Sequence, residues 1–316
     1  MAKPRTRASA RPDAAPRGRS AAARTRKLEH DLDALYESLH YREFKILLKA
    51  EDFDPNDIEA EVHDYWKLTR RVATQLLIHV SRSKTETDPV IRDVAFLDTP
   101  GFDLYRRGYM LRVRRPYQGT QPGRRYELTL KFRGADIARA AAVDLEAAKG
   151  LAGRTKFKEE LLLVSAKLGG MRSIFSHTCQ IKDLERPLGR TLSDYTRIFP
   201  HLGTLGLRAT ARIADVTKVP VQEVLYELGE LGFRGTKTAK VDMAVWRNAK
   251  THEVLIGEFA YETHFRHYGR LHPIPKLRSE RLYRILQRET GAWVELGNTK
   301  TSLYYGLSGK KVAHDE

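Results

Sequence analysis

Two stretches of the sequence alternate charged and apolar side chains: Gly108-Tyr-Met-Leu-Arg-Val-Arg-Arg115 and Tyr126-Glu-Leu-Thr-Leu-Lys-Phe-Arg133. In a β-strand, the side chains of residues i and i+2 point to the same face of the sheet. The first stretch therefore predicts a strand that carries Arg112 and Arg114 on one face. The second predicts a strand with Lys131 on its charged face. Both have an apolar opposite face, so together they predict a sheet that is charged on one side.

Short alternating runs of this kind continue through most of the chain, and turn residues such as Pro and Gly separate them. Together they predict eight strands, at 40–48, 90–98, 108–115, 126–133, 154–164, 206–216, 236–245 and 251–264. Apolar residues at helical spacing predict helices at 54–81, 135–150, 171–184, 221–231 and 276–290. The chain is therefore expected to belong to the α+β class.

The charged faces allow two arrangements. They could form the exposed side of an ordinary antiparallel sheet, with the apolar faces turned toward the core. The predicted helices favour the alternative, because their apolar stripes need a sheet face to cover. If helices cover the apolar face, the charged face must line the lumen of a barrel. We therefore expect an eight-stranded closed antiparallel β-barrel, a tunnel, with helices packed outside.

Basic and acidic residues fall largely on different predicted strands. Arg and Lys neutralise phosphate oxygens, and carboxylates hold hard divalent ions such as Mg²⁺ or Mn²⁺. A lumen that contains both suits a ligand with several phosphates and a divalent cation. The candidate basic residues are Arg112, Arg114, Lys131, Arg133, Arg208 and Arg212, and the candidate acids are Glu43, Glu160, Asp242, Glu258 and Glu262.

Four segments resemble the CYTH, or triphosphate tunnel metalloenzyme, superfamily. Residues 96–115, FLDTPGFDLYRRGYMLRVRR, are similar to the Y-F-D-T-P-x-x-x-L-x-x-x-G-x-A-L-R-x-R stretch of those proteins. Residues 128–131 are similar to their L-T-L-K strand, and 258–262 to their late E-x-E-x-E strand. Residues 298–304 resemble their terminal S-K-x-x-Y segment. The resemblance spans roughly residues 40–305.

The resemblance implies an eight-stranded antiparallel tunnel that hydrolyses or transforms triphosphates. Substrates in the family are inorganic triphosphate, thiamine triphosphate, capped-RNA 5′ ends and ATP, which some members convert to cyclic AMP. By position, the basic residues above would bind phosphate, with Lys45 beside them. The resemblance implies a catalytic set of Glu43, Lys45, Glu258 and Glu262, and a metal site of Glu43, Glu258 and Glu262 for Mg²⁺ or Mn²⁺. Glu160 and Asp242 are further candidate ligands outside the matched motifs, available to compensate for acids that the motifs lack.

Two acidic positions of the family pattern are replaced in this sequence. The opening E-x-E-x-K motif reads Tyr41-x-Glu43-x-Lys45, and the middle acid of the late strand is Ala260. Three functions therefore stay open. The first is metal-dependent hydrolysis of a triphosphate, whether inorganic triphosphate or a nucleoside or thiamine triphosphate. The second is a non-catalytic sensor or scaffold that binds a nucleotide or polyphosphate. The third is a nucleic-acid-binding protein.

The nucleic-acid hypothesis depends on the N-terminal segment. Residues 1–27 contain nine lysines and arginines against one aspartate, a net charge of +8, whereas the whole chain carries +16. The segment has almost no large apolar side chain, so we expect a disordered basic tail. Its binding to nucleic acid or to an acidic membrane, a transit-peptide role and a merely solubilising role all stay open. Residues 28–316 are then expected to form a single tunnel domain.

The remaining composition favours a cytoplasmic protein. The chain has one cysteine, Cys179, which excludes an intrachain disulfide framework and fits a reducing compartment. No apolar run approaches the roughly 20 residues that a membrane-spanning helix needs. The expected partner is thus a triphosphate or polyphosphate small molecule, and no membrane span is expected.

Overall fold

The computed structural model describes residues 31, 33–82, 88–164, 167–185, 189–234, 238–265 and 273–310. The basic segment 1–27 lies outside these residues, so its disorder and its binding to nucleic acid stay predictions. Among the helices that the structure describes, none combines the length and the apolar character needed to cross a membrane.

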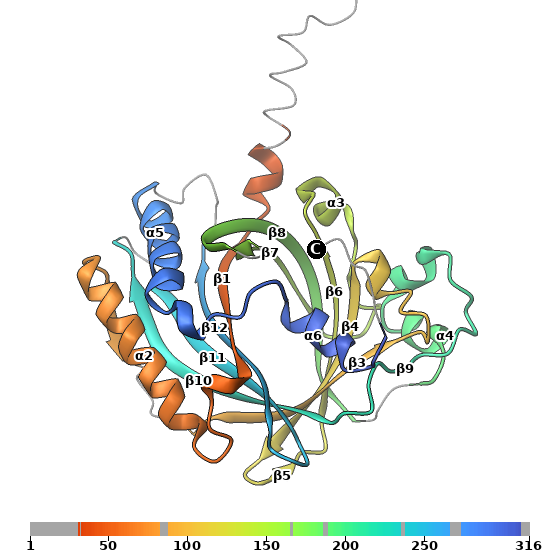
Figure 1. The fold of residues 1–316 in the computed structure, drawn as a ribbon. Coiled ribbons are helices and arrows are strands. Elements are labelled where there is room, and N and C mark those ends of the chain that lie inside the picture. Colours follow the sequence, from red (N-terminus) through yellow and green to blue (C-terminus); the bar gives the residue numbers. More distant parts are fainter. Residues whose placement is uncertain are drawn as a thin grey trace, which may run out of the picture.

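Nine strands close into a barrel, seen from one end in Figure 1. Every neighbouring pair is antiparallel except β1 and β7, which run parallel. The order around the barrel is β10 (Val221–Gly232), β11 (Thr238–Asn248), β12 (Val254–His264), β1 (Tyr41–Leu48), β7 (Gly153–Val164), β8 (Lys167–Leu184), β6 (Tyr126–Gly134), β4 (Tyr109–Gln118) and β3 (Val90–Asp98), which pairs with β10 again. Three short strands pair alongside barrel strands: β2 (His79–Arg82) with β10, β5 (Gln121–Pro122) with β4, and β9 (Ala214–Asp215) with β3.

The prediction of an α+β closed barrel is confirmed, but the eight-stranded antiparallel description is wrong in detail. Residues 171–184 were expected to be helical and belong to β8. Residues 221–231 were also expected to be helical and form β10, in which a bulge between Glu227 and Gly229 shifts the register. A bulge moves the following side chains to the other face. The apolar residues of β10 therefore recur at a spacing that imitates a helix.

The predicted strand at 206–216 is largely absent. Only Ala214–Asp215 pairs with the sheet, as β9. The preceding residues bond to the segment around helix α4 (Leu192–Thr196): the amides of Leu192 and Ser193 donate to the carbonyls of Ala211 and Ala209. This segment therefore lies beside the barrel and contributes no strand across its wall.

Helices cover the outside of the barrel, as expected. The long helices α2 (Ile58–Gln75) and α5 (Pro273–Glu289) lie over one side, and the short helix α3 (Ile137–Ala142) lies on the other with α4 (Figure 1). Under α2 and α5, the outward side chains of β1, β11 and β12 form an apolar cluster with the helices that includes Phe44, Met243 and Phe259. Burial of these apolar side chains holds the helices on the barrel.

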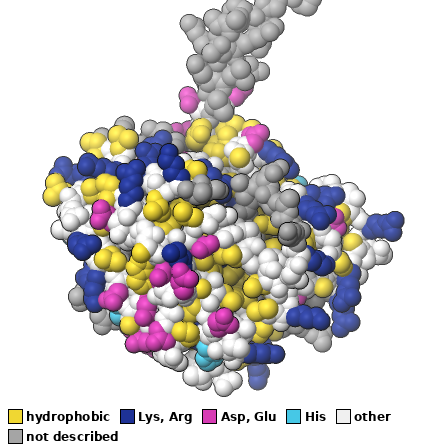
Figure 2. Space-filling view, in the orientation of Figure 1, with side chains coloured by type: hydrophobic (Ala, Val, Ile, Leu, Met, Phe, Trp, Pro, Cys, Tyr) yellow, Lys and Arg dark blue, Asp and Glu magenta, His cyan; other side chains and the backbone are white. Residues whose placement is uncertain are grey.

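One end of the barrel interior is apolar. Inward side chains at the strand ends pack there against helix α6 (Lys300–Gly306), which lies across the barrel in Figure 1. Trp246, Phe96, Tyr304 and Tyr305 are the largest members of this inner cluster. The charged part of the lumen is therefore closed at one end by this apolar cluster, to which α6 contributes. Figure 2 shows Lys, Arg, Asp and Glu side chains scattered over one outer face of the same body.

Candidate functional site in the barrel lumen

The barrel encloses a charged cavity of about 280 Å³. Strand alternation explains its lining, because in β1, β4, β6, β7, β11 and β12 the charged residues share the inward face while their apolar neighbours pack outside. Ten lysine and arginine side chains and five carboxylates line it, a formal surplus of five positive charges. They are Lys45, Arg92, Arg112, Arg114, Lys131, Arg133, Arg154, Lys156, Lys158 and Lys300, with Glu43, Glu160, Glu223, Asp242 and Glu258.

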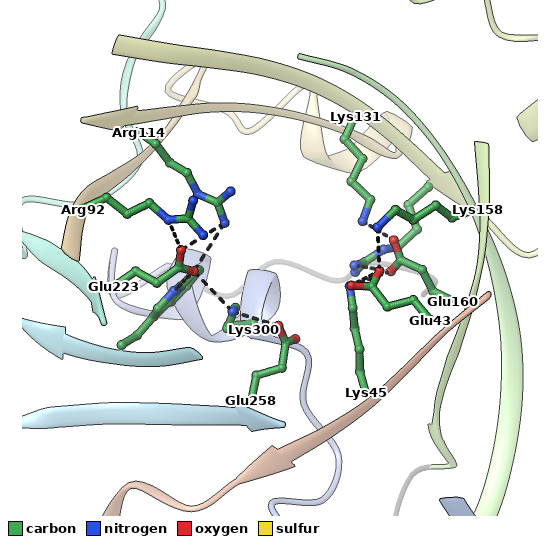
Figure 3. Close-up of polar contacts among 12 residues, drawn as sticks. Glu43, Lys45, Arg92, Arg114, Lys131, Lys158, Glu160, Glu223, Glu258 and Lys300 are labelled. Carbon is green, nitrogen blue, oxygen red and sulfur yellow. Dashed lines mark hydrogen bonds and ion pairs between the residues drawn. The ribbon is translucent and has the colours of Figure 1, made fainter. Parts of the chain in front are cut away.

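Many of these side chains form two groups that face each other across the lumen (Figure 3). The first group is centred on Glu223 of β10. Its carboxylate accepts hydrogen bonds from Arg92 Nε and, at 2.8 Å, from Trp246 Nε1, and lies 3.2 Å from Arg114 Nη2. Burial alone would raise the pKa of Glu223, but Arg114, Lys300 and Arg92 lower it well below its usual range. Glu223 is therefore an internal counter-ion that orients these cations.

The second group is centred on Glu160 of β7. Its carboxylate bonds to Lys131, lies 2.8 Å from Arg133 Nη2 and 3.4 Å from Lys45 Nζ, and accepts a 2.6 Å hydrogen bond from Ser176 Oγ. Glu160 thus faces three cations, of which Lys45 also lies 3.1 Å from Glu43 Oε2. Burial, followed by repulsion from Arg133, accordingly lowers the pKa of Lys131 to about 7 although Glu160 opposes the shift. A bound anion would relieve this repulsion.

Lys158 of β7 connects two further carboxylates. Its Nζ lies 3.2 Å from Glu43 of β1 and bonds to Glu262 of β12. The ring of Tyr41 lies beside it, with Lys156 Nζ and Lys158 Nζ at 4.7 and 5.5 Å from the ring centroid. Cations are attracted to the face of an aromatic ring. Tyr41, which stands at an acidic position of the family pattern, therefore contacts lysines.

Two half-buried charged residues of the lining, Arg112 and Asp242, make no hydrogen bond or ion pair with any described residue. The Nε of Arg112 is buried. Burial and the neighbouring Arg114 lower the pKa of Arg112 to about 9. Burial, followed by repulsion from Glu43 and Glu258, raises the pKa of Asp242 to about 7. Arg112 thus marks an anion-attracting part of the cavity, and Asp242 an acid-rich part.

The lumen carboxylates are the candidate ligands for Mg²⁺ or Mn²⁺. Their oxygens suit such ions chemically, but in the described residues no three acidic, histidine or cysteine side chains converge as ligands. Lys158 bonds to Glu43 and Glu262, and Lys300 Nζ lies 2.8 Å from Glu258. Ala260 supplies no acid between Glu258 and Glu262. As arranged, these residues do not fit a divalent ion, and binding of Mg²⁺ or Mn²⁺ stays a prediction.

Most of the sequence-predicted residues meet in the lumen, and two do not. Arg208 and Arg212 are exposed on the segment beside α4 and do not line the cavity, because the predicted strand that would have carried them inward does not form. Glu262 is not part of the cavity lining itself, but its carboxylate bonds to Lys158, which is. The residues found in the lining are Glu43, Lys45, Arg112, Arg114, Lys131, Arg133, Glu160, Asp242 and Glu258.

Six charged lining residues were not among the site residues predicted from the sequence. Arg92 lies on β3 and shares a face with Val94 and Phe96, so the charged-against-apolar alternation that marks the other strands is missing there. Glu223 was hidden by the helical interpretation of β10, and Lys300 lies on helix α6. The basic positions Arg154, Lys156 and Lys158 follow the alternation of β7.

Comparisons with known proteins give only weak similarities. No family model matches the chain, and no curated protein is similar to it. Among solved structures, a candidate adenylyl cyclase from Hippeastrum, described as having a dominant triphosphatase activity, shares 13% identity at a TM-score of 0.40 over 87% of this chain and 98% of the other. A candidate adenylate cyclase from Bacillus halodurans shares 11% identity at a TM-score of 0.35, over 83% and 98%. A protein from Pyrococcus horikoshii shares 12% identity at a TM-score of 0.31, over 85% and 99%. At these TM-scores the assignment of function depends on the residues of the site.

Proposed function

We propose that the lumen binds a compound with a triphosphate group, such as inorganic triphosphate or a nucleoside or thiamine triphosphate. The observation that carries this proposal is the formal surplus of five positive charges in the described lining of a cavity of about 280 Å³. Unpaired charge is costly away from bulk water. A chain of phosphates places several negative charges in a small volume, so it can satisfy both charged groups at once.

The unpartnered guanidinium of Arg112 supports the same ligand class. Guanidinium groups bind phosphate oxygens with paired hydrogen bonds. Lys131 and Arg133 lie on the neighbouring strand β6, and Arg112 pairs in register with Thr129 of that strand. The resemblance of residues 96–115 and 128–131 to triphosphate-binding tunnels points to the same chemistry.

Calorimetric titration with sodium tripolyphosphate tests the proposal. We expect binding that weakens by at least tenfold, or about 1.4 kcal/mol, in Arg112→Ala combined with Lys131→Ala. Arg208→Ala is the matched control, because that arginine is exposed outside the barrel, and it should bind as the wild type does. If the double variant and the wild type bind equally, the lumen is not the binding site.

Hydrolysis of the triphosphate is a second candidate function, favoured by Asp242. A carboxylate whose pKa lies near 7 in the lumen can accept a proton at neutral pH, as a general base for water requires. We propose that phosphate release from tripolyphosphate, ATP or thiamine triphosphate, measured with Mg²⁺, with Mn²⁺ and with EDTA, falls at least a hundredfold in Asp242→Asn. Absence of turnover with every metal, in protein that binds tripolyphosphate, would leave binding as the function.

A further inference from the structure

We infer that the ammonium groups of Lys158 and Lys300 replace divalent metal in this lumen, so that the protein binds triphosphate without Mg²⁺ or Mn²⁺. The inference deepens the proposed function and rests on it. The resemblance assigns Glu43, Glu258 and Glu262 to a metal ion, whereas in the structure these acids are paired with lysines. The inference follows from this disagreement.

Lys300 connects the carboxylates of two strands. Its Nζ lies 2.8 Å from Glu258 Oε1 on β12 and 3.5 Å from Glu223 Oε2 on β10. The same Nζ lies 4.8 Å from the centre of the Trp246 ring, which adds a cation–π contact. The side chain of Lys300 is only 12% exposed, so its ammonium group interacts mainly with these residues and little with bulk water.

The fold holds Lys300 in this position. It is the first residue of α6, where Thr299 and Ser302 form a capping box. Tyr304 and Tyr305 of the same helix are buried in the inner apolar cluster. The backbone of Lys300 is therefore anchored on both sides, and its ammonium group does not depend on a flexible loop.

Lys158 has the same role on the other side of the lumen. Glu43 of β1 lies directly opposite Glu262 of β12 in the sheet register. Like charges that face each other on adjacent strands destabilise a sheet. Lys158 reaches both carboxylates from β7, and they raise its pKa above the usual lysine range even though burial lowers it. The ammonium group thus supplies the positive charge between two acids that a metal ion would otherwise supply.

A divalent ion would have to compete with these ammonium groups for the same oxygens. Two acids of the family pattern are replaced by Tyr41 and Ala260, so fewer oxygens are left for the ion. Mg²⁺ also requires near-ideal octahedral geometry and gives up water reluctantly. In addition, Mg²⁺ bound to a triphosphate reduces the negative charge that the lumen attracts. Metal-free triphosphate is therefore the preferred ligand.

The test is calorimetric titration of the full chain with sodium tripolyphosphate, in EDTA and in excess Mg²⁺. We expect the Kd in EDTA to be equal to or lower than the Kd in Mg²⁺. A Kd at least tenfold higher in EDTA overturns the inference but leaves the proposed function intact. Absence of binding under both conditions overturns both.

Lysine variants give the second arm of the test. Lys300→Ala frees Glu258, which lies near Asp242, whereas Glu223 keeps its bonds to Arg92 and Trp246. We expect this variant to bind Mn²⁺ alone, detected by electron paramagnetic resonance, where the wild type does not. Lys300→Arg keeps the charge and should behave as the wild type does. Lys67→Ala removes an exposed lysine of α2 and is the matched control. If Lys300→Ala fails to fold, by circular dichroism, Lys158→Gln replaces it. Mn²⁺ binding by the wild type, or its absence in a folded variant, would contradict the inference.

Discussion

Asp242 differs from the other carboxylates of the described lumen lining in that its pKa is raised, whereas theirs are lowered. Burial raises its pKa to about 7, and Glu43 and Glu258 add to the shift. The folded protein therefore binds a proton at Asp242 between the ordinary pKa of 3.8 and about pH 7, where the unfolded chain does not. Because the folded state holds more protons in that window, stability falls as pH rises through it.

Asp242→Asn should remove this pH dependence. We expect the variant to be more stable than the wild type at pH 8 by on the order of 2 kcal/mol, since a shift of one pKa unit corresponds to about 1.4 kcal/mol and the side chain is partly exposed. The difference should shrink toward zero as pH falls to the ordinary pKa of an aspartate. Urea unfolding at a series of pH values measures it. A constant difference across the series would show that Asp242 does not titrate as described.

At the scale of elements, α6 and the loop after β3 are joined by one buried carboxylate. Asp98 is 2% exposed and accepts hydrogen bonds from the amides of Thr99, Leu104 and Tyr105 at 2.7, 2.9 and 3.0 Å. It also accepts one from the hydroxyl of Tyr305 on α6 at 3.0 Å. The ring of Tyr305 stacks on that of Tyr105 at 4.0 Å. These contacts connect the helix that carries Lys300 to the wall of the barrel.

Two substitutions should distinguish the contribution of the Tyr305 hydroxyl from that of the three loop amides that bond to Asp98. Tyr305→Phe removes one of the four hydrogen bonds and should cost about 1 kcal/mol of unfolding free energy. Asp98→Ala leaves three buried amides without an acceptor and should cost about 3 kcal/mol or more. Urea unfolding measures both. Equal costs for the two variants would mean that the loop amides find other acceptors.

At the scale of the whole molecule, closure of the sheet decides where the charge lies. Pairing of β3 with β10 removes both main sheet edges and leaves a surplus of five positive charges inside. In the barrel without a bound anion, repulsion among these charges lowers the free energy of unfolding. Anion binding in the lumen, and not on the outer surface, is therefore expected to stabilise the fold.

Tripolyphosphate at 100 times its Kd should raise the unfolding free energy by about 2.7 kcal/mol. For a domain of this size, the unfolding entropy is about 0.6 kcal/mol per kelvin, which predicts an increase in Tm of about 4 to 5 °C. Differential scanning fluorimetry measures it, with sodium chloride at matched ionic strength as the control. If the chloride produces the same shift, the effect is general screening and not binding in the lumen.

The sequence predicted which side chains face the lumen better than it predicted which segments are strands. Arg112, Lys131 and Glu43 could be placed because alternation assigns a side chain to a face without knowledge of its neighbours. The assignment failed for Arg208 and Arg212, because hydrogen bonds to the segment around α4 replace sheet pairing there. Glu223 could not be placed, because the bulge in β10 makes its apolar spacing resemble that of a helix.

Local alternation of charged and apolar residues, together with helices whose apolar stripes need a sheet face to cover, thus indicated from the sequence alone a closed barrel with a charged lumen under a helical cover. What only the tertiary structure decided is which charges meet. Lys300 contacts Glu223 and Glu258, and Lys158 contacts Glu43 and Glu262, although these residues are far apart along the chain. The physical reason is that strand order and closure bring distant segments together, and no short stretch of sequence records that order.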